Sequence, residues 1–364
     1  MTKAAELAKM GEVLTNSQIG GRRNMVINGA MNVAQRGTST SSVGASSGYF
    51  ACDRWRLFST TSGRATVSQS TDAPNGFKNS FKIDVTTADT SIAATELFII
   101  SYAMEGQDAQ MIKKGTSDAE RLTMSFYAKA NASANYVVEM YDADNTRNNT
   151  QAFTVTDSWQ RFSFTFAPDT TGALDDDNAL SFYPIQIWLH GGSNYSSGTF
   201  ASNTWGSVTN ANRYAGSRTS IFDSTDREFY VTGVQVEVGS QATPFEYKSF
   251  GEELALCQRY FFDHRPSDGY EFFGVGVHTS STNNVNLVNF PQEMRAAPSF
   301  SSTGNFRNWN RGGTVAWSAV NMNSVSKKNC TLEVTLSSGG ITDGATLIGD
   351  NNDTSARLNF DAEL

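Results

Sequence analysis

From residue 24 onward, hydrophobic and polar residues alternate along most of the chain. Alternation of this kind places one face of a β-strand in a core and the other face in solvent. The runs are short, rich in aromatic or β-branched residues, and bounded by Gly, Asn, Asp or Ser. The clearest runs cover residues 81–85, 122–126, 136–140, 162–166, 183–189, 234–238, 273–277, 285–287, 332–336 and 358–362. Since only short helical patterns interrupt these strands, they predict antiparallel sheets packed as a sandwich or jelly roll.

Two short segments depart from this pattern. Residues 2–14 are rich in helix-forming residues, and Leu7, Met10 and Leu14 form one apolar seam. A helix this short is marginal alone in water, so it is either a frayed amphipathic tail or a helix that oligomerises or docks. Near the middle of the chain, Ser249 and Glu252 have the spacing of a helix capping box. This second pattern predicts a short linking helix.

We therefore expect an all-β protein with two β-sandwich domains. Residues 1–20 form an N-terminal attachment or oligomerisation helix with its linker, and residues 21–248 form a jelly-roll sandwich. The linking helix covers residues 249–262, and a second C-terminal β-sandwich covers residues 263–364.

Composition excludes several classes of function. The chain has 364 residues and a net charge of −8, with no block of Lys or Arg, which argues against a nucleic-acid partner. No apolar run is long enough for membrane insertion, and the first residues lack the apolar core of a signal peptide. Synthesis in a cytoplasm is therefore expected. The three cysteines are far apart, which excludes a disulfide framework and a Cys-x-x-Cys metal site.

Catalytic motifs are missing from the sequence, so we expect a protein that is not an enzyme. There is no Gly-x-Ser-x-Gly elbow and no phosphate-binding loop, and the three histidines are widely scattered. Asp175, Asp176 and Asp177 form the densest carboxylate group, which is either a weak candidate for Ca²⁺ or a solvated acidic loop. Otherwise no cofactor is expected.

Aromatic residues in polar segments are the more plausible binding chemistry, since sugars stack on rings and pair with polar side chains. Trp188 and Trp317 lie in alternating runs and can equally belong to the core. We expect the recognition site on a C-terminal loop, where Phe306 and Trp309 can stack on a sugar and Arg307 and Arg311 can pair with acidic groups. If Trp309 is instead a core residue, this prediction fails.

Five segments resemble signatures of bacteriophage tail-fibre and receptor-binding virion proteins. They occur in the same order as in that family, at residues 23–38 (RNMVINGAMNVAQRGT), 48–55 (GYFACDRW), 231–246 (VTGVQVEVG followed by ATPFE), 256–260 (LCQRY) and 294–298 (MRAAP). In physical terms these segments suit scaffold roles, with turns at Asn28-Gly29 and Arg36-Gly37 around a strand over residues 31–34.

The resemblance implies a jelly roll like that of carbohydrate-binding modules, in a homotrimer assembled in the host cytoplasm and placed on the virion exterior. Its partners would be another virion protein, bound through residues 1–20, and a host-surface carbohydrate or receptor. Two alternatives remain open: a head fibre or capsid-decoration protein with a purely structural role, and a polysaccharide depolymerase.

Overall fold

The computed structural model describes residues 3–4, 23–265, 271–310, 313–338, 346–351 and 354–364. The chain divides into two compact units: the first comprises residues 1–250 with Leu364, and the second comprises residues 251–363. Antiparallel strands dominate both units, which confirms the predicted all-β fold class. The helix expected in residues 1–20 lies almost entirely outside the described residues.

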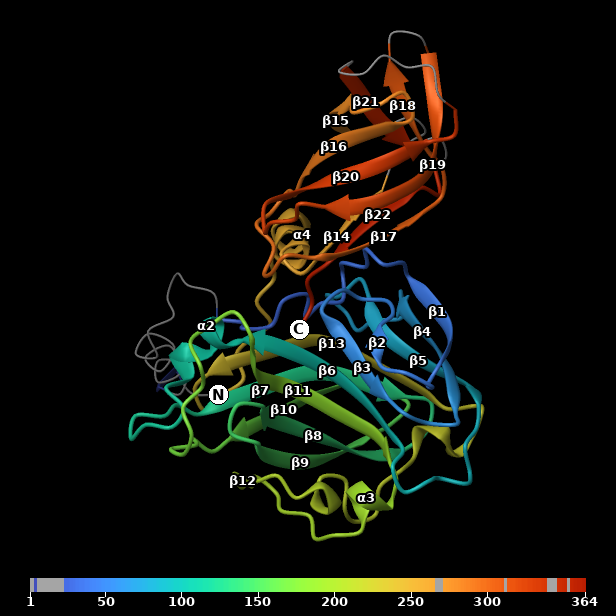
Figure 1. The fold of residues 1–364 in the computed structure, drawn as a ribbon. Coiled ribbons are helices and arrows are strands. Elements are labelled where there is room, and N and C mark those ends of the chain that lie inside the picture. The colour runs from blue at the N-terminus through green and yellow to red at the C-terminus, as the bar shows by residue number, and fades with distance from the viewer. Residues whose placement is uncertain (1–2, 5–22, 266–270, 311–312, 339–345, 352–353) are drawn as a thin grey trace. The chain divides into compact units, whose positions relative to one another are not determined.

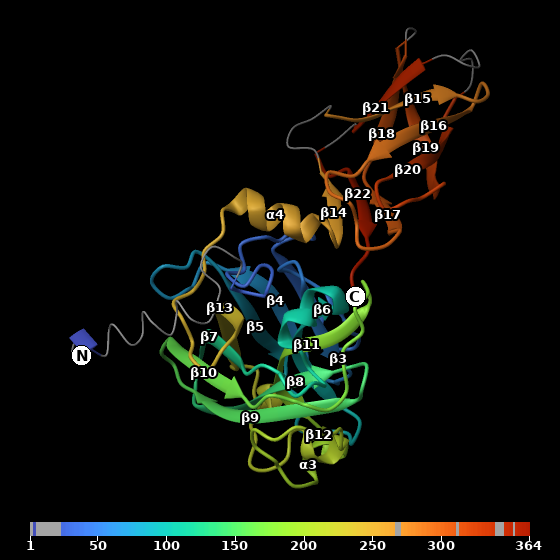
Figure 2. The ribbon, with the colours of Figure 1, turned by 90° about the vertical axis from the view of Figure 1, so that its left-hand side faces the viewer.

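The first unit is a jelly-roll sandwich of two antiparallel sheets (Figures 1 and 2). The first sheet contains, in spatial order, β1 (Ser39–Val43), β4 (Arg64–Ser70), β5 (Ser80–Thr87), β13 (Glu228–Val238), β7 (Leu122–Ala130) and β10 (Gln160–Phe166). The second sheet contains β12 (Gly206–Ser207), β9 (Arg147–Val155), β8 (Ala134–Asp142), β11 (Leu180–Gly191), β6 (Leu97–Glu105), β3 (Trp55–Ser59) and β2 (Gly48–Tyr49).

The core of this unit lies between the two sheets and contains the residues that the alternation predicts. On β7, Met124 and Phe126 are fully buried, and on β8 so are Tyr136, Val138 and Met140. Short helical turns connect the strands, namely α2 (Gly106–Ala109), η1 (Gln110–Ile112), α3 (Ser193–Ser196), η2 (Asn210–Asn212) and η3 (Ile221–Asp223). No helix among the described residues is both long and apolar enough to cross a membrane.

The segment that precedes β1 is tied to the last strand of the sandwich by Asn24. Its side-chain amide donates to the carbonyl of Val234 at 3.1 Å, and its Oδ1 accepts from the backbone N–H of Val236 at 3.2 Å. The backbone of Gly29 accepts from the N–H of Val234 at 2.9 Å, and a side chain at Gly29 would collide with the Val234 carbonyl. The first and third signature segments therefore lie side by side in the fold.

Asn28 ties the same segment to the start of β3. Its amide donates to the carbonyls of Val33 (2.8 Å) and Asp53 (2.9 Å), and its Oδ1 accepts from the N–H of Val33 (3.0 Å). The indole of Trp55 donates to the Asn28 carbonyl at 3.0 Å. The strand expected over residues 31–34 does not form, because these side-chain hydrogen bonds replace a β-ladder there.

The predicted linking helix is α4 (Phe250–Gln258), whose first residue belongs to the first unit and the rest to the second. The second unit continues with strands. A three-stranded sheet contains β14 (Phe261–His264), β22 (Arg357–Asp361) and β17 (Ser299–Thr303). The remaining strands close into a barrel in the order β15 (Phe272–His278), β16 (Asn283–Asn289), β20 (Asn329–Leu336), β19 (Gly313–Asn323), β18 (Phe306–Asn310) and β21 (Thr346–Asn351) (Figure 1).

The sequence predicted a second sandwich in this unit, whereas six of its strands form a closed barrel. The prediction of strands was correct, but alternation with a period of two residues is the same in both architectures and does not indicate closure. The fourth and fifth signature segments meet in this unit, where the N–H of Arg295 donates to the carbonyl of Arg259 at 2.8 Å. Cys52, Cys257 and Cys330 are buried, and burial raises the pKa of the Cys330 thiol to about 11.

Replacing Asn28 by glycine tests its structural role. Asn28 has a φ of 58°, which glycine adopts without strain, so Asn28→Gly removes only the side-chain hydrogen bonds. We expect the first unit to lose about 3 kcal/mol, since each of three buried hydrogen bonds contributes about 1 kcal/mol. Urea unfolding followed by tryptophan fluorescence measures this, because four of the six tryptophans lie in the first unit.

Asn203→Gly is the matched control for this experiment. Asn203 also has a positive φ, of 52°, but it is exposed. A loss of stability in Asn28→Gly no larger than that in Asn203→Gly would contradict the role assigned to Asn28.

Candidate functional site

The outer face of the second sheet carries a polar side chain at the same register on six neighbouring strands. The pairing of β9, β8, β11, β6, β3 and β2 aligns Thr150, Glu139, Gln186, Ser101, Arg56 and Tyr49 in one row. We call this set the polar row. Since neighbouring strands are about 4.8 Å apart, the row is about 24 Å long, the length of a short oligosaccharide.

Rings and guanidinium groups form a continuous series of contacts over the same face. In order along the series, the contacts are Arg36 over Tyr49 (4.9 Å), Tyr49 to Arg56 (5.9 Å), Arg56 over Phe58 (4.5 Å), Phe58 to Tyr183 (5.7 Å), Tyr183 to Tyr141 (6.0 Å), Tyr141 to Arg213 (5.2 Å) and Arg213 over Trp188 (4.7 Å). We call these eight residues the aromatic–arginine strip. It crosses the sheet along the polar row.

The acidic centre of the face is fixed by its neighbours. Glu139 is fully buried, and its two oxygens accept from the amide of Asn148 (2.5 Å), the indole of Trp188 (2.7 Å) and the guanidinium of Arg213 (2.7 to 3.1 Å). Burial alone would lower the pKa of Arg213, but the Glu139 carboxylate raises it overall, so Arg213 stays charged. Arg213 also donates to Oε1 of Gln186 at 3.0 Å. Glu139 therefore orients Trp188 and holds Arg213 in place at one end of the strip.

Part of the strip is open to solvent. Arg36, Tyr49, Arg56, Phe58, Tyr141 and Arg213 are half-buried, whereas Tyr183 and Trp188 are buried. Burial raises the pKa of the Tyr183 phenol above its ordinary value, so the hydroxyl keeps its proton at neutral pH. At one end of the strip, Tyr49 Oη and Arg56 Nη1 both donate to the carbonyl oxygen of Leu364, at 3.0 and 3.1 Å. These two residues can therefore bind one oxygen acceptor together.

This arrangement suits a carbohydrate ligand. Partly exposed rings offer flat apolar surfaces on which the C–H face of a sugar can stack. Guanidinium, amide and hydroxyl groups at fixed positions beside those rings can pair with sugar hydroxyls. The side chains are also held before a ligand arrives, which reduces the entropy cost of binding.

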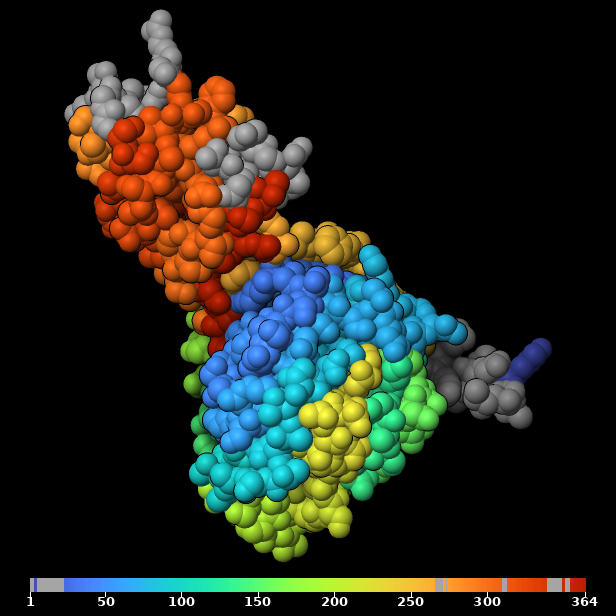
Figure 3. All heavy atoms as spheres, turned by 90° about the vertical axis from the view of Figure 1, so that its right-hand side faces the viewer, coloured from blue at the N-terminus to red at the C-terminus, as the bar shows by residue number. Residues whose placement is uncertain are grey.

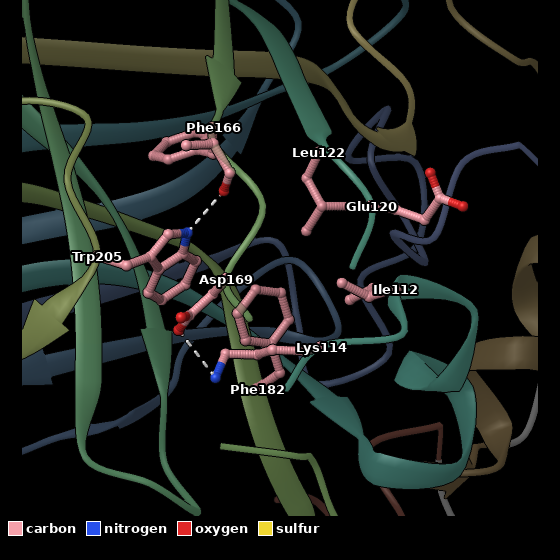
Figure 4. A pocket seen from close by; sticks show the side chains of 9 residues that line it. Ile112, Lys114, Glu120, Leu122, Phe166, Asp169, Phe182 and Trp205 are labelled. Atoms are coloured by element: carbon pink, nitrogen blue, oxygen red, sulfur yellow. Dashed lines mark hydrogen bonds and ion pairs between the residues drawn. The ribbon is translucent and has the colours of Figure 1, made fainter. Parts of the chain in front are cut away.

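Two hollows of the first unit are less suited to a ligand. A cavity of about 10 Å³ near Lys114, Asp169 and Trp205 has room for at most one water (Figure 4). Lys114 pairs there with Asp169 at 3.0 Å, and the Trp205 indole donates to the Ala167 carbonyl at 2.8 Å. A second hollow of about 390 Å³ lies beside Asp223 and Arg227. The charges of these two residues already pair with each other, at 2.6 Å. The first hollow is too small for a sugar, and the second, among the described residues, is lined by no aromatic ring.

The predicted recognition residues that the structure describes lie on the barrel, and they differ in exposure and in their contacts. Residues 306–310 form strand β18, so the expected loop is not a loop. Phe306 is buried and stacks on Trp317 at 5.1 Å, which leaves no face for a sugar. Arg307 pairs with buried Asp350 at 2.9 Å, Trp309 is 47% exposed on the outer face, and Arg311 lies outside the described residues.

The predicted carboxylate group is exposed and has its own local partners. Asp175, Asp176 and Asp177 all lie on the surface, and Asp177 Oδ1 accepts from the N–H of Ala179 at 2.9 Å. In the part of the chain that the structure describes, a grouping of side chains able to hold a metal ion occurs elsewhere, at Asp89, Glu96 and His190.

Comparison with known proteins adds little beyond the fold. No protein-family profile matches the sequence, and no curated protein matches it. Similar solved structures include a family 4 carbohydrate-binding module (15% identity, 58% of this chain and 98% of that chain, TM-score 0.29). Another is the xylan-binding CBM22-1 domain of Paenibacillus barcinonensis Xyn10C (12%, 60% and 96%, TM-score 0.28). A third is the enzymatically active domain of bacteriophage CBA120 tailspike protein 4 (12%, 59% and 21%, TM-score 0.31).

Similarities at these TM-scores cannot assign a function. The function is therefore inferred from the side chains of the strip. The sequence did not predict the strip, although it contains a partial signal. Arg56 and Phe58 alternate with Trp55 and Leu57, which marks one cationic and one aromatic residue on the solvent side of β3. Their partners on β8 and β11 depend on strand register, which the sequence pattern does not provide.

Proposed function

We propose that this protein is a non-enzymatic virion protein of a bacteriophage, a tail fibre or tail-associated protein, that binds a host-surface glycan. The observation that carries the glycan part is the aromatic–arginine strip aligned with the polar row on one face of the jelly roll. The five signature segments support the virion part, because they resemble those of phage receptor-binding proteins.

A binding role fits this site better than catalysis. Glycoside hydrolysis uses one carboxylic acid to protonate the leaving group and a second carboxylate on the other side of the bond. Glu139 is fully buried and accepts hydrogen bonds from Asn148, Trp188 and Arg213, so it is placed to orient side chains. The depolymerase alternative therefore requires an acid pair away from the strip.

We further propose a homotrimer on the virion exterior, assembled in the bacterial cytoplasm and attached to another virion protein through residues 1–20. The barrel supports self-association, because its outer face exposes apolar side chains that burial would favour. Val275, Val277 and Leu287 are 57%, 47% and 46% exposed on the paired strands β15 and β16. Exposed aliphatic side chains grouped in this way are typical of an interface.

The second candidate is a head fibre or capsid-decoration protein without a receptor of its own. The signature segments favour this candidate, since the side-chain amides of Asn24 and Asn28 donate to backbone carbonyls within the fold and so have a structural role. Absence of binding to any host glycan would favour this candidate.

Substitutions in the strip test the proposed glycan site. Tyr141→Ala removes a half-exposed ring and Arg56→Ala removes a half-exposed guanidinium. We expect each variant to bind host-surface polysaccharide about tenfold more weakly, since a stacked ring or a charged hydrogen bond contributes about 1 to 2 kcal/mol. A glycan array identifies the ligand, and isothermal titration calorimetry then gives the Kd of each variant.

Two aromatic residues outside the strip provide matched controls. Trp159 is half-buried on the first unit and donates to Asp72 at 3.0 Å, and Trp309 is an exposed ring on the barrel strand β18. We expect Trp159→Ala and Trp309→Ala to bind as the native protein does. If Trp309→Ala loses binding while Tyr141→Ala keeps it, the site lies on the barrel and the strip is not the receptor site.

The proposed self-association has a separate test. Light scattering of the full-length protein at micromolar concentration should give the mass of a trimer, and the double variant Val277→Asp/Leu287→Asp should shift it toward the monomer. Thr335→Asp places the same charge on an exposed polar position of the barrel and should leave the mass unchanged. A native monomer would contradict the proposed trimer.

Deleting residues 2–20 should prevent particle attachment and leave both β units folded.

A further inference from the structure

Two carboxyl groups and an imidazole meet at one end of the jelly roll, where His190 lies two residues after Trp188 on β11. Asp89 follows β5, Glu96 immediately precedes β6, and His190 lies near the end of β11. Their side chains are 5%, 6% and 0% exposed, and one ligand atom from each lies within 4.8 Å of the others. Figure 3 shows the cyan surface around residues 85–105 next to the yellow surface around residues 215–230, and the N–H of Asp89 donates to the Phe222 carbonyl at 2.8 Å.

Neutral donors fix the two carboxyl groups. Asp89 accepts from the N–H of Ser91 and the hydroxyl of Thr61, both at 3.2 Å. Glu96 accepts from the N–H and the hydroxyl of Ser62 at 3.0 and 3.1 Å, and from the N–H of Ala93 at 2.9 Å. None of these donors carries a positive charge. Two buried carboxylates this close together require a shared proton or a cation.

His190 is held in the orientation of a metal ligand. Its Nδ1 lies 2.7 Å from the hydroxyl of Ser220, and Ser220 in turn accepts from the N–H of Phe222 at 3.0 Å. The Phe222 ring packs edge-on against the imidazole at 5.5 Å. Nε2 is buried without a hydrogen-bond partner and lies 3.8 Å from Oε2 of Glu96. One ring nitrogen is therefore oriented by the protein, and the other faces the carboxylates.

We infer that Asp89, Glu96 and His190 form a binding site for one divalent transition-metal ion of the Zn²⁺ class. One imidazole nitrogen and two carboxylate oxygens are ligands that zinc accepts, and three protein ligands leave a position for water. The ion would neutralise both carboxylates. Ca²⁺ fits less well, because it prefers oxygen ligands only.

An ion here would link the segment between β5 and β6 to the end of β11. Its role would be structural, because the three ligands come from two segments at the edge of the sandwich.

Zinc binding by the full-length, untagged protein tests this inference. After dialysis against a chelator, reloading with zinc and removal of the unbound excess, we expect one Zn²⁺ per chain by elemental analysis. Competition with a chromophoric chelator should give a micromolar or lower Kd. Zinc should raise the Tm, and Ca²⁺ at the same concentration should not. His190→Gln should weaken zinc binding more than about tenfold and abolish the Tm shift.

His278→Gln is the matched control, because His278 is also a buried imidazole but lies on the barrel strand β15. It should bind zinc as the native protein does. If circular dichroism shows that His190→Gln does not fold, Asp89→Asn and Glu96→Gln take its place with the same expected loss. No zinc binding by the native protein, unchanged binding in the variants that fold, or equal binding of Ca²⁺ would each overturn the inference.

Discussion

The hydrogen bonds of Asn24 and Asn28 determine how the first unit is assembled. Asn24 contacts Val234, 210 positions later in the chain, and so closes the sandwich between its first segment and its last strand. Asn28 holds the turn that leads into β3 and supports the buried indole of Trp55. Since Arg56 and Phe58 follow Trp55 on the same strand, their positions on the outer face depend on Asn28.

The two faces of the same strands have different roles: one face packs in the core, and the other carries the strip and the polar row. Inward residues of β8 and β11 form the core, whereas Glu139, Tyr141, Tyr183 and Gln186 on their outer side carry the strip and the polar row. At the end of β11, His190 leaves this pattern and faces Glu96. The sandwich therefore carries the side chains of both proposed sites, the strip on β8 and β11 and the metal ligand His190 at the end of β11.

Hydrophobic alternation predicted ten of the strands that the structure describes, because burial of one face determines that pattern directly. Leu122 to Phe126 and Leu332 to Leu336 became the strands β7 and β20. The same pattern could not distinguish a barrel from a sandwich, and it could not show that Phe306 points inward to Trp317. The contact of Tyr141 with Tyr183 depends on register between β8 and β11, which only tertiary packing determines.

Hydrogen–deuterium exchange of the full-length protein with and without a host-surface glycan tests the proposed glycan site most directly. We expect the glycan to slow exchange in β3, β8 and β11, which carry Arg56, Tyr141 and Tyr183. Exchange in β18 and β19 of the barrel should stay the same. Slower exchange confined to β18 and β19 would contradict the assignment of the glycan site to the aromatic–arginine strip.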